Sequence, residues 1–206
     1  EQSEKRSEQV VTGRTELLPL HRETGFDGLP AGAGTAAATP PVRPCALAFD
    51  GPDPELDGRY RRQGERELLF THTDDRLRPF LKDREYLSCS AFLHSTGGYR
   101  YLTLEFTFAY PNAAEAYGMI EKNSLLTVRL LNGEFVNFRS GTLATGSYNT
   151  RTELLTYSVF YPIDRAQLSL LKNSEVDFIR VFWSSGFEEY EVYRMDFFQR
   201  QLGCVD

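Results

Sequence analysis

From residue 45 onward, the hydrophobic positions of this chain recur mainly at every second residue. Apolar and polar side chains alternate over residues 87–94 and again over residues 101–108, with a turn at residues 95–98 between them. Successive side chains of a strand point to opposite faces of a sheet, so this period indicates strands with one buried face. The two segments predict one long antiparallel hairpin.

The same period continues further along the chain. Residues 126–130 and 136–138 flank Asn132-Gly133, the strongest short hairpin signal, and residues 155–161 form another alternating run that we expect to end at Pro162. Nearer the start, residues 59–62 and 67–72 predict a hairpin around Gln63 and Gly64.

A dense apolar run follows at residues 176–183 and predicts a central strand that is buried on both faces. Ser184 to Gly186 then break the run, since glycine adopts the backbone angles of a tight turn without steric cost. The next residues, 187–193, alternate again. This stretch therefore predicts a second C-terminal hairpin.

Two segments have helical spacing instead. Asp164 is a good N-cap for a helix over residues 164–173, and Met195, Phe198 and Leu202 predict a helix over residues 195–202. A third helix, over residues 73–82, conflicts with Pro79 in its interior. The pattern predicts an α+β fold with a predominantly antiparallel sheet, a sandwich being one arrangement, and two or three short helices.

The first 44 residues differ in composition. Residues 28–44 read GLPAGAGTAAATPPVRP, a mixture with too little apolar surface to offset the entropy lost on folding. We predict a flexible tail or linker over residues 1–44 and a single β-rich domain over residues 45–206.

Charge and hydropathy exclude two classes of protein. With 29 acidic and 23 basic residues the net charge is −6, which argues against nucleic-acid binding. No apolar stretch is long enough for a transmembrane helix. The chain begins at Glu1 without a leader, so we expect either a cytosolic protein or one whose leader was removed.

The number and positions of the cysteines do not decide whether any of them form a disulfide. The three cysteines are too few for a disulfide framework and too scattered for a zinc site. If the protein is exported, a disulfide between Cys89 and Cys204 is the pairing that we predict, because Cys204 ends a helix that must pack on the core. Three inert thiols are the alternative.

Known catalytic motifs are absent from the sequence, and no cofactor or metal is predicted. His21, His72 and His94 have no metal ligand at suitable spacing. The acidic loop over residues 50–57 suits a hard cation but lacks the spacing of an EF-hand, so we expect a solvated loop.

Acidic residues near the C-terminus are the main candidates for catalysis. Glycoside cleavage needs two carboxyl groups across a cleft, and Glu188, Glu189 and Glu191 lie close together in the chain. On a strand, however, Glu189 and Glu191 share one face and Glu188 lies on the other, which suits a solvated sheet.

Aromatic residues provide the candidates for binding. Tyr99, Tyr101, Tyr148 and Tyr190 could stand on a sheet face or loop where a sugar ring or a partner protein stacks. Aromatic filling of a compact β core is the alternative.

The C-terminal half resembles a family of uncharacterised bacterial domains of the Bacteroidetes type, with the pattern RVxWSSG[YF]E[DE]YEVY followed by DFxxxQLxC. The matching residues are Arg180, Trp183, Gly186, Glu188, Tyr190, Tyr193, Asp196, Phe197, Gln201 and Cys204. The resemblance reaches back to about Phe70, and residues before Cys45 lie outside it. It implies a bacterial protein of the cell envelope and carries no activity.

We therefore expect a non-catalytic binding or assembly module of the bacterial envelope or exterior, periplasmic or secreted, whose ligand is a protein or a glycan. Two alternatives stay open. One is an enzyme that acts on carbohydrate or another polar substrate through paired carboxylates, and the other is a structural spacer.

Overall fold

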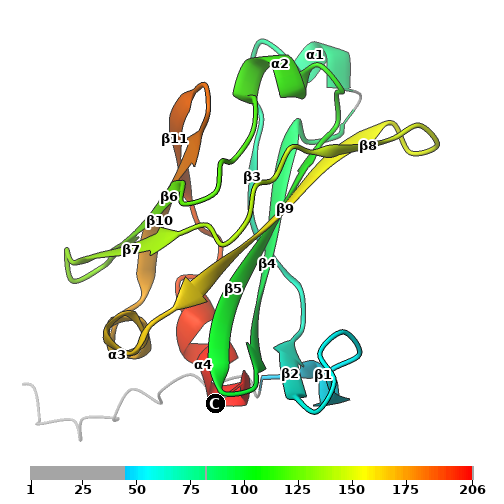
Figure 1. Cartoon of the computed structure of the whole chain (residues 1–206). Coiled ribbons are helices and arrows are strands. Elements are labelled where there is room, and N and C mark those ends of the chain that lie inside the picture. Colours follow the sequence, from blue (N-terminus) through cyan, green and yellow to red (C-terminus); the bar gives the residue numbers. More distant parts are fainter. Residues whose placement is uncertain (1–44, 82, 206) are drawn as a thin grey trace, which may run out of the picture. The chain divides into compact units, whose positions relative to one another are not determined.

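A computed structural model describes residues 45–81 and 83–205, which lie within one compact unit spanning Pro41–Asp206. The tail predicted over residues 1–44 is outside the described residues. The described part of the chain forms eleven strands and four short helices (Figure 1). In chain order these are β1 Leu47–Pro52, β2 Tyr60–Gly64, β3 Glu67–His72, α1 Arg78–Leu81, β4 Leu87–Thr96, β5 Tyr99–Phe108, α2 Ala113–Tyr117, β6 Leu125–Leu130, β7 Phe135–Arg139, β8 Ser147–Asn149, β9 Leu154–Ile163, α3 Arg165–Asn173, β10 Val176–Trp183, β11 Gly186–Glu191 and α4 Phe197–Val205.

The strands form two antiparallel sheets. The larger sheet has seven strands in the order β1-β2-β4-β5-β9-β8, with β3 also paired to β4, and the smaller sheet has four in the order β11-β10-β6-β7. The predicted α+β class with mainly antiparallel strands is confirmed. The hairpins of β4 with β5, β6 with β7 and β10 with β11 all form as the alternation predicts.

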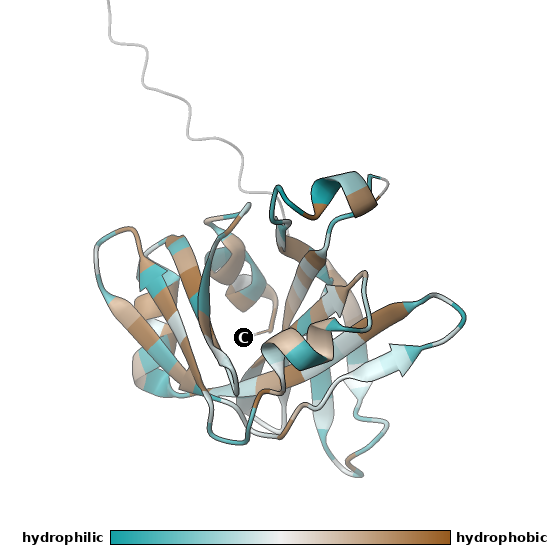
Figure 2. Cartoon of the chain, turned by 90° about the horizontal axis from the view of Figure 1, so that it is seen from above, coloured by the Kyte–Doolittle hydropathy of each residue, from teal (hydrophilic) through white to brown (hydrophobic). Residues whose placement is uncertain are grey.

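The hydrophobic core lies between the two sheets. Hydrophobic and hydrophilic residues alternate along the strands, as Figure 2 shows from above. Trp183 on β10 is 5% exposed, and its indole ring contacts Phe106, Phe108 and Tyr157 of the larger sheet edge to face, at centroid distances of 5.0, 5.9 and 5.3 Å. Aromatic pairs favour this tilted arrangement. Trp183 is therefore a core residue, as its sequence context predicts.

Helix α4 lies at the end of the sheets opposite α1 and α2 (Figure 1) and packs against β2, β4 and α3. Its Gln201 is 2% exposed, donates to the carbonyl oxygen of Glu65 at 2.8 Å and accepts from the backbone N–H of Leu93 at 3.2 Å. Gln201 lies so close to Gly64 that a Cβ there would collide with its side-chain amide. Glycine at residue 64 therefore allows the helix to approach β2.

The disulfide in the structure joins Cys45 to Cys204, with Cα atoms 5.8 Å apart, so the predicted bond between Cys89 and Cys204 is wrong. Cys89 is a free, completely buried thiol. It lies on the core side of β4, where the strand alternation places it, whereas Cys204, near the end of α4, meets Cys45, two residues before β1.

Other predictions also differ from the structure, and the helix expected over residues 195–202 instead spans Phe197–Val205. Strands β2 and β3 do not pair with each other, because the long strand β4 pairs with β3 through one half and with β2 through the other. Strand β10 is central but not buried on both faces, since Phe178, Arg180 and Phe182 are only half-buried. The helix expected over residues 73–82 shortens to the four residues of α1.

Candidate functional site

The four candidate tyrosines lie in different places. Tyr99 and Tyr148 are 64% and 43% exposed, and Tyr101 is half-buried. Tyr190 is 4% exposed and stacks on Phe70 with ring centroids 4.2 Å apart, so the prediction that it contacts a ligand is contradicted. Tyr148 lies on the edge strand β8, away from the other three. Tyr99 and Tyr101, two residues apart on one face of β5, each border a concave surface.

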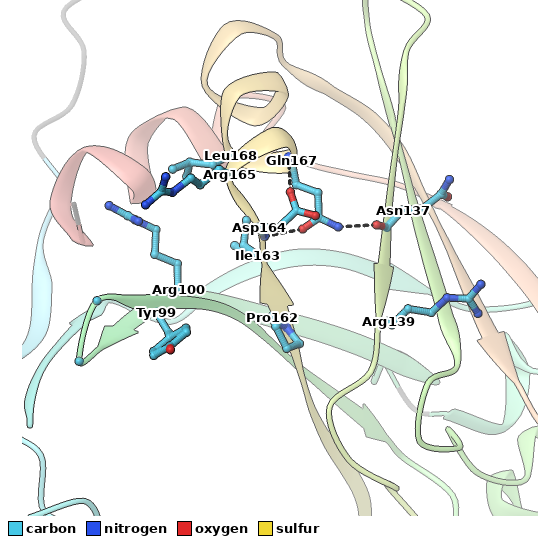
Figure 3. A pocket seen from close by; sticks show the side chains of 12 residues that line it. Tyr99, Arg100, Asn137, Arg139, Pro162, Ile163, Asp164, Arg165, Gln167 and Leu168 are labelled. Atoms are coloured by element: carbon cyan, nitrogen blue, oxygen red, sulfur yellow. Dashed lines mark hydrogen bonds between the residues drawn. The ribbon is translucent and has the colours of Figure 1, made fainter.

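One concave surface, which we call the arginine groove, has a volume of about 800 Å³ and is bordered by Tyr99 (Figure 3). Its walls come from the β4–β5 turn, the end of β9, the first turn of α3 and strand β7. The residues that line it are Gly97, Gly98, Tyr99, Arg100, Asn137, Arg139, Pro162, Ile163, Asp164, Arg165, Gln167 and Leu168. This volume is in the range of small-molecule and oligomer-binding clefts.

A capping box fixes the α3 wall of the groove. Asp164 Oδ1 accepts from the backbone N–H of Gln167 at 2.8 Å, and Gln167 Oε1 accepts from the backbone N–H of Asp164 at 2.7 Å. The Gln167 side chain also donates to the carbonyl oxygen of Asn137 at 2.6 Å, as the dashed lines in Figure 3 show. These bonds satisfy the helix N-terminus and hold α3 against β7. Helix α3 therefore begins directly after the predicted N-cap, and these hydrogen bonds hold the groove wall to β7.

Two glycines shape the opposite wall. Gly97 and Gly98 have φ angles of 57° and 86°, in the left-handed region that other residues rarely adopt. The two-residue turn that they form joins β4 to β5 and places Tyr99 at the first position of β5. The exposed ring of Tyr99 thus borders the groove beside a turn without side chains, on the other side of β5 from Arg100 and Arg165 (Figure 3).

Arginine side chains give the groove a positive charge. It is lined by Arg100, Arg139 and Arg165, and by one carboxylate, Asp164, which caps α3. In Figure 3, Arg100 and Arg165 extend to the same side, while Arg139 lies at the other end and donates to the carbonyl oxygen of Asn123 at 3.1 Å. Because the whole chain has a net charge of −6, this positive surface is a local feature. It favours an anionic ligand.

The candidate carboxylates of β11 do not come together as a catalytic pair. Glu188 accepts from the hydroxyl of Tyr190 at 2.6 Å, whereas Glu189, on the opposite face of the strand, forms an ion pair with Arg180. Glu191 lies on the same face as Glu189, opposite Phe178 of β10, and is exposed. This arrangement matches a solvated sheet face, the interpretation that the strand geometry favours.

The acidic loop after β1 is held by its own backbone. Asp53 is 9% exposed, and its Oδ1 accepts from the backbone N–H groups of Glu55 and Leu56 at 2.8 and 3.1 Å. The bond from Glu55 is the main reason that the pKa of Asp53 lies below its usual value. Among the described residues no group of three or more metal-ligating side chains is found.

The groove arginines were not among the candidates that the sequence suggested, because they come from three distant segments. One local signal existed. Arg165 is the first residue of α3, where the positive end of the helix dipole disfavours a cation. A basic residue directly after a strong N-cap therefore indicates a role other than helix stability.

Comparisons of the chain with protein-family models, with curated proteins and with solved structures give no match. No helix in the described ranges is long and apolar enough to cross a membrane. The resemblance to the bacterial family therefore stays a prediction, and the function is inferred from the site.

Proposed function

We propose that the domain is a non-catalytic binding module that holds an acidic glycan in the arginine groove. The observation that carries this proposal is the presence of three arginines and an exposed tyrosine around one concave surface of an otherwise acidic chain. Guanidinium groups bind carboxylates through paired hydrogen bonds, and aromatic rings offer a flat face for stacking. An oligosaccharide of uronic acids carries carboxylates and sugar rings on successive units, so different units can meet the arginines and the tyrosine.

The carboxylates support binding over catalysis. Cleavage of a glycosidic bond needs two acids on either side of it. The carboxylate that lines the groove, Asp164, is engaged in the capping box of α3, and Glu188 and Glu189 lie on opposite faces of β11. A spacer domain, the other alternative, would need no charged groove.

The disulfide supports an extracytoplasmic location. Disulfides persist in oxidising compartments and are rare in the cytosol. The Cys45–Cys204 bond is therefore consistent with a domain exported to the bacterial envelope or exterior, as the sequence resemblance implies.

Calorimetry with tetragalacturonate and with the neutral maltotetraose tests the proposal. We expect the acidic tetrasaccharide to bind and the neutral one to bind at least about tenfold more weakly in the groove, because a charge-assisted hydrogen bond contributes roughly 1.5–3 kcal/mol. Arg165→Gln and Tyr99→Ala should each weaken binding of tetragalacturonate about tenfold. Arg151→Gln, which changes an exposed arginine outside the groove, should leave it unchanged.

Binding of tetragalacturonate that Arg165→Gln leaves unchanged, or no binding of tetragalacturonate at all, would contradict the proposal. Salt gives a second readout, since the attraction between exposed charges is screened over about 10 Å at 0.1 M salt. Affinity for tetragalacturonate should fall as the salt concentration rises.

A further inference from the structure

A second concave surface lies on the face of the larger sheet that is turned away from the core. This outer-face cavity has a volume of about 460 Å³. It lies over β4, β5 and β9 and is bordered by the loop between β1 and β2. Tyr101, the second candidate tyrosine in contact with a concave surface, is part of its wall.

The strand register explains why aromatic side chains gather there. His94 of β4 lies directly opposite Tyr101 of β5, and Phe160 of β9 lies opposite Thr103 of β5. The rings of His94 and Tyr101 stack with centroids 5.0 Å apart and an interplanar angle of 19°. Phe160 meets Tyr101 edge to face at 5.8 Å. The cavity is thus walled by three adjoining rings from three adjacent strands.

Polar groups with unused hydrogen-bonding capacity line the same cavity. Within the described part of the chain, no hydrogen bond is formed by the hydroxyl groups of Tyr101 and Ser158. Arg61 donates through one Nη atom to Gln63 at 2.7 Å, but its Nε is buried and has no acceptor among the described residues. Asp53 Oδ2 accepts from the Thr96 hydroxyl at 3.2 Å. Unpaired polar groups beside a cavity are costly unless water or a ligand satisfies them.

The charged groups of the cavity leave a small negative excess. Burial, together with the positive charge of Arg61, lowers the pKa of His94 to about 4, so His94 is neutral at physiological pH. Asp53 and Glu55 carry negative charge, and Arg61 carries positive charge. Unlike the arginine groove, this cavity has no excess of cations to attract an anion. It presents rings together with hydroxyl, carboxylate and guanidinium groups.

We propose that the outer-face cavity is a separate binding site for a neutral sugar, in which a pyranose ring stacks on the aromatic wall and its hydroxyl groups bond to Tyr101, Ser158 and Asp53. Sugar hydroxyls both donate and accept, so they complement a hydroxyl and a carboxylate equally well. The cavity volume is within the range of small-ligand sites. The proposal uses none of the groove arginines and does not depend on an acidic ligand.

Saturation-transfer NMR and calorimetry with the methyl glycosides of glucose, galactose, mannose and N-acetylglucosamine test this site on the full chain. We expect at least one of the four sugars to bind. Tyr101→Leu should weaken the binding of that sugar about tenfold, because the stacking face and the hydroxyl are lost. Ser158→Ala should weaken it about threefold, because one hydrogen bond is lost. Ser158 is exposed, so its variant tests the site without disturbing the fold.

Two control variants separate this site from other surfaces. Tyr148→Leu changes an exposed tyrosine on the edge of the same sheet, and Arg165→Gln removes a groove arginine; both should leave the affinity for the neutral sugar unchanged. Absence of binding by all four sugars would overturn the proposal. So would binding that neither Tyr101→Leu nor Ser158→Ala weakens, or binding that Arg165→Gln abolishes.

Discussion

Arg200 on α4 forms an ion pair with Glu67 on β3, with Nη2 and Oε2 2.5 Å apart. The Gln201 amide donates to the other oxygen of the same carboxylate at 2.8 Å, and Asp196 binds Arg200 at 3.0 Å. The Arg200 side chain is only 10% exposed. These bonds join residues that are 133 and 134 positions apart in the chain. They connect the last helix, α4, to the first residue of β3 in the larger sheet.

In Glu67→Gln, the free energy of unfolding should depend less strongly on pH below 4.5 than it does in the wild type. Burial alone would raise the pKa of Glu67, but hydrogen bonds from Arg200 and Gln201 outweigh burial and lower it. A carboxyl group with a lowered pKa in the folded state stabilises the fold above its ordinary pKa of 4.5, and this contribution is lost as the pH falls further.

At neutral pH, Glu67→Gln should lower the free energy of unfolding by about 1.5–3 kcal/mol, since a charged hydrogen-bonded pair is broken. Urea denaturation at neutral pH and at about pH 3.5 measures this difference, which should shrink at the lower pH. Glu191→Gln, at an exposed residue, is the matched control. A constant difference across the two conditions would show that the ion pair is not responsible.

Trp183→Ala should be among the most destabilising single substitutions in the domain. It removes a buried ring that contacts aromatic residues of the opposite sheet, and such truncations cost about 3–5 kcal/mol. Phe187→Ala, at a residue that is 56% exposed, should cost less than about 1 kcal/mol. Chemical denaturation of both variants checks this. A nearly neutral Trp183→Ala would mean that the core does not lie between the sheets as described.

Thiol counting tests the disulfide. Protein from an oxidising compartment should show one reactive thiol after unfolding without reductant, that of Cys89, and three after reduction. In the folded protein Cys89 should not react, because it is buried and burial raises the pKa of its thiol. Labelling of Cys45 or Cys204 in unreduced protein would refute the bond.

The double variant Cys45→Ser, Cys204→Ser should lower the free energy of unfolding by about 2–5 kcal/mol, because the bond closes a loop between residues 159 positions apart. Thermal melting of wild type in the presence and absence of reductant gives the same comparison without mutation. Equal stability in both conditions would contradict a structural role for the bond.

His94 should make the fold sensitive to mild acid. Its pKa of about 4 in the folded state lies below the ordinary value of 6.5, because burial and the charge of Arg61 disfavour the protonated ring, while Asp53 favours it. The unfolded chain therefore binds a proton more readily, and the free energy of unfolding should fall as the pH drops from 6.5 towards 4. NMR titration of the His94 ring measures this pKa directly.

His94→Gln should remove that part of the pH dependence. The variant and the wild type are compared by denaturation at pH values on both sides of 6.5. An unchanged slope between pH 6.5 and about 4 would show that another group titrates there.

Local pattern predicted most of the fold but not its longest-range features. The strands of the β4–β5 hairpin and the capped helix α3 depend on periodicity and on one capping residue, which are visible in the sequence. The pairing of both β2 and β3 with β4, and of Cys45 with Cys204, depends on which segments meet in space. The alternation of side chains along a strand does not show which other segments that strand will meet.

The same contrast holds for the candidate site: features that depend on a local pattern were predicted, and features that depend on packing were not. Tyr99 was among the candidates because an aromatic residue near a predicted turn can stand on a sheet face or loop, and only the structure shows that it is exposed. Arg100, Arg139 and Arg165 were missed, since each is an ordinary basic residue in its own segment and only the packing of α3, β5 and β7 brings them to one groove. Tyr190 was assigned incorrectly because alternation shows which residues share a face but not which face is covered.

Whether the arginine groove is the binding surface can be tested by an NMR titration of ¹⁵N-labelled protein with tetragalacturonate. We expect the largest chemical-shift changes on Gly97, Gly98, Tyr99, Arg165 and Gln167, and we expect about tenfold more tetragalacturonate to be needed for the same changes in Arg165→Gln. Changes confined to the outer sheet faces, or no changes at all, would contradict the proposal that the groove is the binding surface.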